Sequence, residues 1–454
     1  MTTSAPPSLM EKAERAVDWV RSRAPGIEAE VYCGRGEDRG LELREGKLRI
    51  VQEAAEEGMG LRLFRDGRMA FASAGGPVED LENLFSGAYR QLAHLPHDEH
   101  RGPPAPPASG GPEDSLAESL YDPALFTRPL QDWAPVLFDM QERALRMYTR
   151  VRKVLQAGYG EGRSEVAIAS TAGVRAYERG TSCGFGLSVM GEEGSEVQVG
   201  SGSTSARSGG GLDCVRETEN AVWRSVSLLG ARKLPSRRRA VLIDPWVAGE
   251  FLDLVVGALS ADVVQRGRSL FKGRLGERVA SPRVTFVDDP RRPGGVASAL
   301  FDDEGLPTRR KTLMDAGVLR EYFYDDYTAR KAGRASNASA SRSGYRGLPG
   351  PGPSNFYMEP GYMSRESLIA DTSEGILALE LLGMHTADPV SGEFSIGVAG
   401  VEVENGRLGR GVKGAMVSGN LLGVLAGIDA AADDLHFYGS IAAPTFRIAG
   451  LMVA

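Results

Sequence analysis

Histidine and acidic side chains are the residues of this sequence that could hold a catalytic metal. One dense group occurs, the segment HLPHDEH, where His97 and His100 flank Asp98 and Glu99. A catalytic zinc needs about three protein ligands in a rigid arrangement. The segment opens a stretch that is rich in Pro and Gly, so we interpret it as a solvated loop and predict no metal site there.

The other candidate ligands are isolated in the sequence. His385 and His436 are far apart, and we interpret each as a structural or surface histidine. The cysteines form no CxxC pair, which argues against a structural zinc site and against a disulfide framework. There are three of them: Cys33, Cys183 and Cys214.

A nucleophile motif and several acidic pairs are the remaining chemical candidates. The segment GTSCG at 180–184 matches G-x-S-x-G, but a strand pattern follows it where a nucleophile elbow needs a helix. The acidic pairs could bind Mg²⁺ or Ca²⁺, but Asp beside Gly or Pro is typical of turns and helix caps, which we favour. These pairs are Asp288-Asp289, Asp302-Asp303-Glu304, Asp325-Asp326 and Asp433-Asp434.

Composition limits the classes of partner. The chain has 454 residues with a net charge of −7, which gives no reason to expect binding to nucleic acid. The N-terminal segment lacks the apolar region of a signal peptide, and no apolar run reaches the ~18 residues of a membrane span. We therefore expect a cytoplasmic protein that does not associate with membranes.

Periodicity in the sequence predicts the elements that would position these residues. Apolar residues recur at helical spacing in five segments, namely 8–24, 78–94, 131–156, 213–230 and 247–260. Strand patterns meet at hairpin turns, which we place at Glu45-Gly46, Asp66-Gly67 and Asn405-Gly406. A meander is predicted over 376–417, and a long loop over 333–361.

Shifts in composition suggest three regions in an α+β protein. Residues 1–114 form a helix-plus-meander region that ends in a Pro/Gly-rich linker at 95–114. Residues 115–235 form a middle α+β region, which together with 1–114 is expected to make one N-terminal unit. Residues 236–454 form a strand-rich C-terminal domain. From the residues alone, no constellation amounts to an active site.

The order of motifs in the second half resembles the TldD/PmbA family, and specifically its PmbA (TldE) branch. The similar stretches are RGRSLFKGRLGERVASPRVTFVDDP (266–290), FDDEGLPTRRKTLMDAGVLREYFYDDYTARKAG (301–333), SNFYMEPG (354–361), SGEFSIGVAGVEVENG (391–406) and VSGNLL (417–422). This resemblance implies a barrel-like C-terminal domain after an N-terminal α/β sheet domain. It also implies a cytosolic protein linked to zinc-dependent cleavage of unfolded peptides, in which TldD and TldE form a heterodimer around a cavity.

The resemblance also locates the family's metal helix. In the TldD branch this helix carries His-Glu-x-x-x-His, and a cysteine near the C-terminus completes the zinc site. Counting back from Arg266 places Leu252 at the first His position, Asp253 at the Glu position and Gly257 at the second His position. The last cysteine here is Cys214, so one carboxylate remains of that ligand set, which is too few for zinc.

The resemblance therefore implies a non-catalytic TldE/PmbA-type subunit with no metal or cofactor of its own. Its partner would be a TldD-like metallopeptidase that carries the zinc, or a second copy of this chain. Its substrate would be an unfolded peptide. We expect the loop 333–361 to face the peptide through Arg342, Tyr345, Arg346 and Asn355. Two alternatives stay open: a stand-alone homodimer that binds peptides, and a metallopeptidase with a relocated metal site at His385, at His436 or at an acidic cluster.

Overall fold

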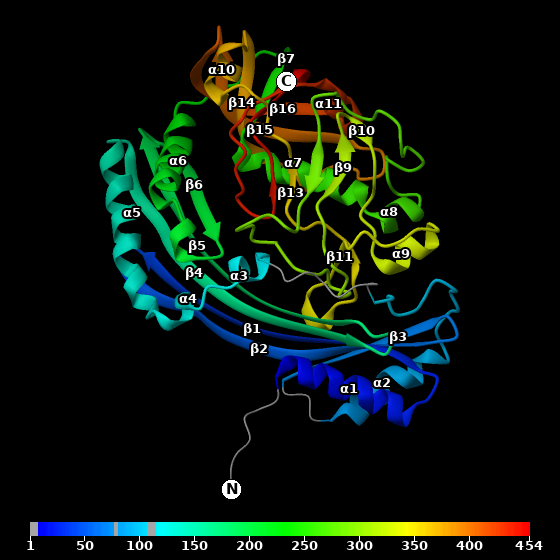
Figure 1. Cartoon of the computed structure of the whole chain (residues 1–454). Helices are drawn as coiled ribbons and strands as arrows, with labels where there is room; N and C mark the ends of the chain where they lie inside the picture. Colours follow the sequence, from blue (N-terminus) through cyan, green and yellow to red (C-terminus); the bar gives the residue numbers. More distant parts are fainter. Residues whose placement is uncertain (1–7, 77–79, 107–114) are drawn as a thin grey trace.

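The computed structural model describes residues 8–76, 80–106 and 115–454. It has two large parts, a long curved sheet built from the first half of the chain and a barrel-containing second half that lies in the curve of that sheet (Figure 1). This mixed architecture confirms the predicted α+β class. No helix within the described ranges is long and apolar enough to cross a membrane.

The curved sheet has six antiparallel strands in the order β3-β2-β1-β4-β5-β6. Its strands are β1 (Glu28–Arg44), β2 (Lys47–Arg65), β3 (Arg68–Gly75), β4 (Val151–Ser170), β5 (Arg175–Glu193) and β6 (Glu196–Ala206). The predicted hairpins at Glu45-Gly46 and Asp66-Gly67 are confirmed. All four of these residues have positive φ angles, as a two-residue turn of type I′ requires.

Helices cover the curved sheet at its two ends, so that one sheet carries two separate cores. Leu63 of β2 packs with α1 and α2 in one core, and Val189 of β5 packs with α5 and α6 in the other. The helices and short turns of this half are α1 (Leu9–Arg23), α2 (Leu81–Leu92), α3 (Leu116–Leu120), α4 (Ala124–Thr127), η1 (Leu130–Trp133), α5 (Ala134–Met147), η2 (Gly209–Gly211) and α6 (Cys214–Ser227).

Two expectations for this half need correction. The helix predicted over 131–156 ends at Met147, and strand β4 starts at Val151, because that segment pairs with β5 instead. The predicted linker is also attached to the rest of the molecule over 95–106. The phenol of Tyr327 donates to Asp98 at 2.7 Å, and Arg330 donates to the carbonyl of Pro103. The remainder of the linker, 107–114, lies outside the described residues.

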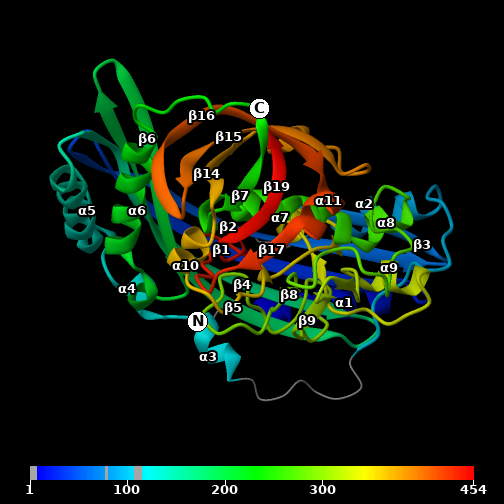
Figure 2. The same cartoon turned by 90° about the horizontal axis from the view of Figure 1, so that it is seen from above.

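The C-terminal half contains a closed five-stranded barrel, as expected. Strands β16, β15, β14, β7 and β19 are neighbours in that order, and pairing of β16 with β19 closes the ring (Figure 2). These strands and their neighbours are β7 (Arg237–Ile243), β14 (Glu374–Leu382), β15 (Glu393–Glu404), β16 (Arg407–Asn420), β17 (Ile428–Ala431) and β19 (Phe446–Val453). Strands β14 to β16 are the predicted meander, with the expected turn at Asn405-Gly406.

A smaller sheet and several short helices connect the barrel to the curved sheet. The smaller sheet has the order β10-β9-β8-β13-β18, and its strands are β8 (Phe286–Asp288), β9 (Lys311–Asp315), β10 (Val318–Leu319), β13 (Phe356–Met358) and β18 (Ile441–Ala442). A two-stranded ribbon joins β11 (Ala340–Ser341) and β12 (Gly350–Pro351). The helices and turns are α7 (Pro245–Leu259), α8 (Ala261–Gln265), α9 (Asp326–Lys331), η3 (Gly344–Arg346), α10 (Arg365–Ala370), η4 (Met384–Thr386) and α11 (Leu421–Gly427).

Candidate functional site

Helix α7 carries the positions where the resemblance places a metal helix. Asp244 caps its start by accepting a hydrogen bond from the backbone of Trp246 at 2.9 Å. Leu252 is 1% exposed and packs into the core that fills the barrel. Asp253 and Gly257 lie on the opposite, outward side of the helix. The first of the three positions is therefore a packing residue.

The outward side of α7 offers two carboxylates. Glu250 and Asp253 are three residues apart, so they share one face of the helix. Partial burial raises the pKa of both, and for Glu250 the negative charge of Asp253 adds to this effect. Neither Leu252 nor Gly257 has a ligand atom, so α7 does not fit the zinc of the TldD branch. Across the described ranges, no three His, Cys, Asp or Glu side chains are arranged to hold a metal.

The remaining histidines lie in unrelated surroundings. His385 is exposed in η4. His436 stacks edge-on against Tyr438, with ring centroids 4.3 Å apart, and contacts Arg216. Burial and then the positive charges of Arg216 and Arg224 lower the pKa of His436 to about 4.

Two of the four residues predicted to contact peptide have their side chains engaged within the protein. Asn355 is fully buried, and its amide donates to the carbonyl of Asp289 and to the hydroxyl of Ser298. The side chain of Arg342 is 1% exposed, and its guanidinium donates to Glu30 at 2.8 Å. Both side chains therefore hold segments of the chain together.

The other two residues lie where the 333–361 segment meets the curved sheet. Tyr345 is 4% exposed and fills a groove over Gly58, Gly60 and Gly75, where Cβ atoms would overlap it. Arg346 is exposed and lies 3.5 Å from Glu56. Of the four predicted residues, Arg346 is the one whose charged group faces solvent.

A buried charge network fixes the C-terminal half on the curved sheet. Glu30 and Arg62 are direct partners on β1 and β2, and their side chains form an ion pair. Arg62 also donates to Glu304 at 3.0 Å, while Arg342 approaches Glu30 from the opposite half of the molecule. Burial raises the pKa of Glu30, but the two guanidinium groups more than compensate, so its pKa is lowered. Glu30 is thus held ionised at the contact between the halves.

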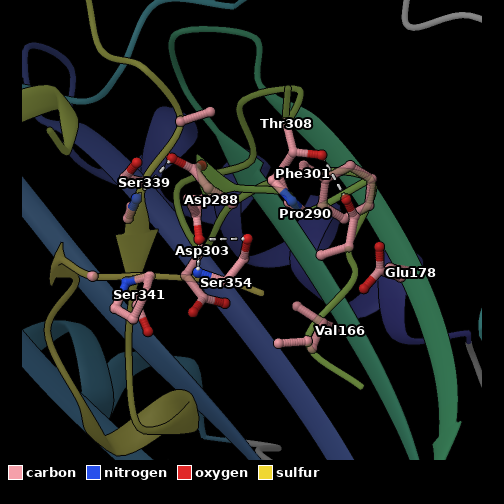
Figure 3. A pocket seen from close by; sticks show the side chains of 17 residues that line it. Val166, Glu178, Asp288, Pro290, Phe301, Asp303, Thr308, Ser339, Ser341 and Ser354 are labelled. Atoms are coloured by element: carbon pink, nitrogen blue, oxygen red, sulfur yellow. Dashed lines mark hydrogen bonds between the residues drawn. The ribbon is translucent and has the colours of Figure 1, made fainter. Parts of the chain in front are cut away.

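Next to this network lies a cavity of about 210 Å³, which we call the acidic cavity (Figure 3). It lies between β4 and β5 of the curved sheet and the loops of the C-terminal half. Its carboxylates are Glu178, Asp288, Asp302 and Asp303, and its hydroxyls include Ser339, Ser341, Ser354 and Thr308. Segments far apart in the sequence therefore supply one polar lining.

Burial disfavours negative charge in this cavity. It raises the pKa of Glu178 to about 7, although the backbone N–H of Leu300 donates to this carboxylate. It raises the pKa of Asp302 to about 7 as well, against three backbone hydrogen bonds, and it also raises that of Asp303. The positive charge of Arg207 lowers the pKa of Glu178, and the negative charge of Asp303 raises it by a smaller amount.

The remaining acid, Asp288, has internal partners. Ser354 donates to one of its oxygens through both backbone and hydroxyl, and the fully buried Lys311 lies 3.0 Å from the other. Ser339 differs from these groups. Its side-chain oxygen is buried at the cavity wall and has no hydrogen-bond partner among the residues that the structure describes.

A second, larger cavity of about 560 Å³ lies between α6, α10 and the 433–438 segment, and we call it the arginine groove. Arg365 donates to Asp244 at 2.5 Å, and Arg224 donates to the hydroxyl of Tyr438 at 2.9 Å. Arg224 also lies over the ring of Trp246, 4.2 Å from its centroid. The cations of this groove are therefore engaged with neighbouring side chains.

Sequence reasoning missed Glu178 and Ser339, and it treated Asp302 and Asp303 as turn formers. The turn role is correct for Asp302, which accepts from the backbone of Glu304 and Leu306. The sequence did contain a sign of Glu178, because side chains alternate between the two faces of a strand. Glu178 lies on the same face of β5 as the buried Ala176 and Gly180. An acid on the covered face of a strand needs a partner or a function.

Comparison with family models covers most of the chain. Residues 29–92 match PmbA/TldA metallopeptidase domain 1, residues 129–229 match the central domain, and residues 236–454 match the C-terminal domain. Among named relatives, a metalloprotease of Methanocaldococcus jannaschii is 26% identical over 94% of this chain and 93% of its own. Metalloprotease PmbA of Escherichia coli O157:H7 is 28% identical over 53% of this chain and 50% of its own.

Solved structures agree with the family models. A Thermotoga maritima protein described as a proposed modulator of DNA gyrase superposes with a TM-score of 0.88 at 25% identity, over 98% of this chain and 100% of its own. TldE from Thermococcus kodakarensis superposes with a TM-score of 0.85 at 20% identity, over 98% of this chain and 99% of its own, which shows the shared fold.

Proposed function

Because the chain belongs to the PmbA/TldD family of metallopeptidases, we propose that it is a non-catalytic subunit of the TldE/PmbA type. In this role it pairs with a TldD-type subunit that supplies the zinc, and it helps to hold an unfolded peptide. The observation that carries the proposal is the state of α7, where a buried leucine and a glycine stand at the two histidine positions.

A bound zinc ion lowers the pKa of its water and polarises a carbonyl, and it needs three protein ligands to stay in place. On α7 the candidate positions provide Asp253 alone, with Glu250 one turn away. We therefore assign the bond-breaking step to a partner subunit and peptide binding to this chain.

Native mass spectrometry of the purified chain, alone and mixed with a TldD-type protein from the same genome, tests this proposal. We expect the chain alone to carry no stoichiometric zinc. We expect the mixture to form a one-to-one complex with one zinc ion, and peptidase activity to require that complex. Stoichiometric zinc on the isolated chain, or peptide cleavage by it, would contradict the assignment and direct the search to His385 and His436.

A further inference from the structure

We propose that the acidic cavity is a subsite for an ammonium group of the bound peptide, either its N-terminal amine or the side chain of a lysine. The inference rests on the proposed function, because it specifies which chemical group of the peptide this subunit takes.

Two carboxylates of the cavity have unused hydrogen-bonding capacity. Within the described residues, the side chain of Glu178 accepts one hydrogen bond, from the backbone of Leu300. The side chain of Asp303 accepts one as well, from the backbone of Arg342 at 2.8 Å. Each carboxylate therefore keeps one oxygen that no described donor occupies. Glu178 lies on β5 and Asp303 on a loop of the C-terminal half, both at the wall of the cavity (Figure 3).

An uncharged side chain of the cavity, Ser339, also has unused hydrogen-bonding capacity. Ser339 is 4% exposed, and no described residue forms a hydrogen bond with its hydroxyl at the cavity wall. Its backbone is fixed, since its N–H donates to Tyr324 at 3.2 Å and its carbonyl accepts from Gly352 at 2.8 Å. Leaving a buried hydroxyl unpaired is costly, so such a group in a native protein calls for an explanation. A ligand that donates hydrogen bonds in the cavity would supply one.

An ammonium group matches this lining better than other ligands do. It carries three N–H donors and one positive charge, which suit two carboxylate oxygens and one hydroxyl oxygen. Asp303 and Glu178 would repel an anion such as the C-terminal carboxylate of a peptide. A metal is not favoured, because the described side chains include no group of three suitable ligands.

Size limits the ligand to a small group. At about 210 Å³, the cavity is smaller than the ~300–1,000 Å³ of pockets that hold drug-sized molecules. It suits a chain end or one side chain, with the rest of the peptide outside. Glu178 and Ser339 would then recognise one positively charged group of the peptide, and they would not contact the rest of its sequence.

Calorimetric titration of the full-length protein at pH 7.5 tests the proposal with three versions of one unstructured peptide. The first has a free N-terminal amine and no lysine or arginine, the second is N-acetylated, and the third is N-acetylated with one internal lysine. We expect the acetylated peptide to bind at least about fivefold more weakly than the first, because it lacks the charged donor. If the third peptide regains the affinity, the lysine side chain can supply the ammonium group. If it does not, the N-terminal amine is the group that binds.

Variants of the cavity sharpen this test. Glu178→Gln keeps an acceptor for Leu300, and Ser339→Ala removes the unpaired hydroxyl. Each should shrink the difference in affinity between the free and the acetylated peptide. Glu142→Gln makes the same charge change on the exposed face of α5 and should leave the difference intact. Thermal melting confirms that each variant is folded.

The outcomes separate this inference from the proposed function. Equal affinity for free and acetylated peptides, or a preference that survives both cavity variants, would overturn the ammonium subsite and leave the peptide-binding role standing. Lack of binding by all three peptides would contradict the peptide-binding role itself.

In that case a second experiment compares the effects of n-butylammonium and of n-butanol on the melting temperature of the protein. Stabilisation by the amine alone, lost in Ser339→Ala, would keep the cavity as an ammonium site, and no stabilisation would end both proposals.

Discussion

The acidic cavity and the arginine groove both lie where the C-terminal half meets the first half of the chain. They differ in whether their charged side chains already have partners within the protein. The groove is larger, about 560 Å³ against about 210 Å³, but its arginines already bind Asp244, Glu217 and Tyr438. Among the described residues that line the groove, the unpaired buried atom is Nε of Arg224, and this side chain is bonded through its other nitrogens. The two cavities therefore differ in unused hydrogen-bonding capacity as well as in volume.

The largest expected effect comes from removing the network beside the acidic cavity. Glu30→Ala leaves Arg62 and Arg342 facing each other without their shared carboxylate, and Arg62 keeps only Glu304. Breaking a buried pair by deleting one partner costs about 3–5 kcal/mol, so we expect a loss of that order in the free energy of unfolding measured with urea.

The control for this prediction is on the same strand. Glu37 pairs with Arg163 at 2.5 Å, but both side chains are more than a third exposed. Glu37→Ala should cost less than about 1 kcal/mol. If the two variants lose the same free energy of unfolding, burial does not make this network stronger than an exposed ion pair.

A smaller effect should follow from filling the groove that receives Tyr345. A methyl group at Gly58 would overlap the tyrosine ring, so Gly58→Ala should lower the free energy of unfolding by about 1–3 kcal/mol. In a Tyr345→Ala background the same substitution should cost nothing further. Gly36→Ala is the control, since its Cβ would meet no atom closer than 3.9 Å. An equal cost of Gly58→Ala in both backgrounds would contradict the packing argument, and the double-mutant cycle measures this directly.

The two cavities should also respond to pH with opposite signs. Glu178 has an ordinary pKa of 4.5 that the fold raises to about 7, so between these values the folded protein binds more protons than the unfolded chain. Its contribution to stability is therefore present at low pH and is lost as the pH rises through 7. Wild type should lose about 2 kcal/mol more than Glu178→Gln between pH 4.5 and 8, and parallel pH profiles of unfolding would refute this.

In the arginine groove, the pKa of His436 falls from 6.5 to about 4, so the folded protein binds fewer protons than the unfolded chain in that range. Its contribution is present above pH 6.5 and is lost as the pH falls towards 4. Because the side chain is a quarter exposed, we expect a modest difference, about 1 kcal/mol between wild type and His436→Gln on going from pH 7 to 4.5.

The sequence predicts some features of this molecule and leaves others unpredicted. Features that depend on neighbouring residues were predictable, such as α7, the two-residue turns and the meander that became part of the barrel. The acidic cavity was not, because Glu178, Asp303 and Ser339 meet only when three distant segments pack together. Arg342 and Asn355 were predicted to contact peptide because they are polar residues of a predicted loop. Their side chains are buried instead, through contacts with distant segments. The metal-helix positions could be located only through the family resemblance.

The long strands of the curved sheet have a consequence for synthesis of the protein. Strand β1 pairs with β2 on one edge and with β4, more than a hundred residues later, on the other. At about 5–20 residues per second, a ribosome needs on the order of 6–25 s to pass from the end of β1 to the end of β4. During that time the second edge of β1 has no partner, and an open edge of this length invites pairing with other chains. The nascent protein should therefore need a chaperone most in this interval, before the middle of the chain has been made.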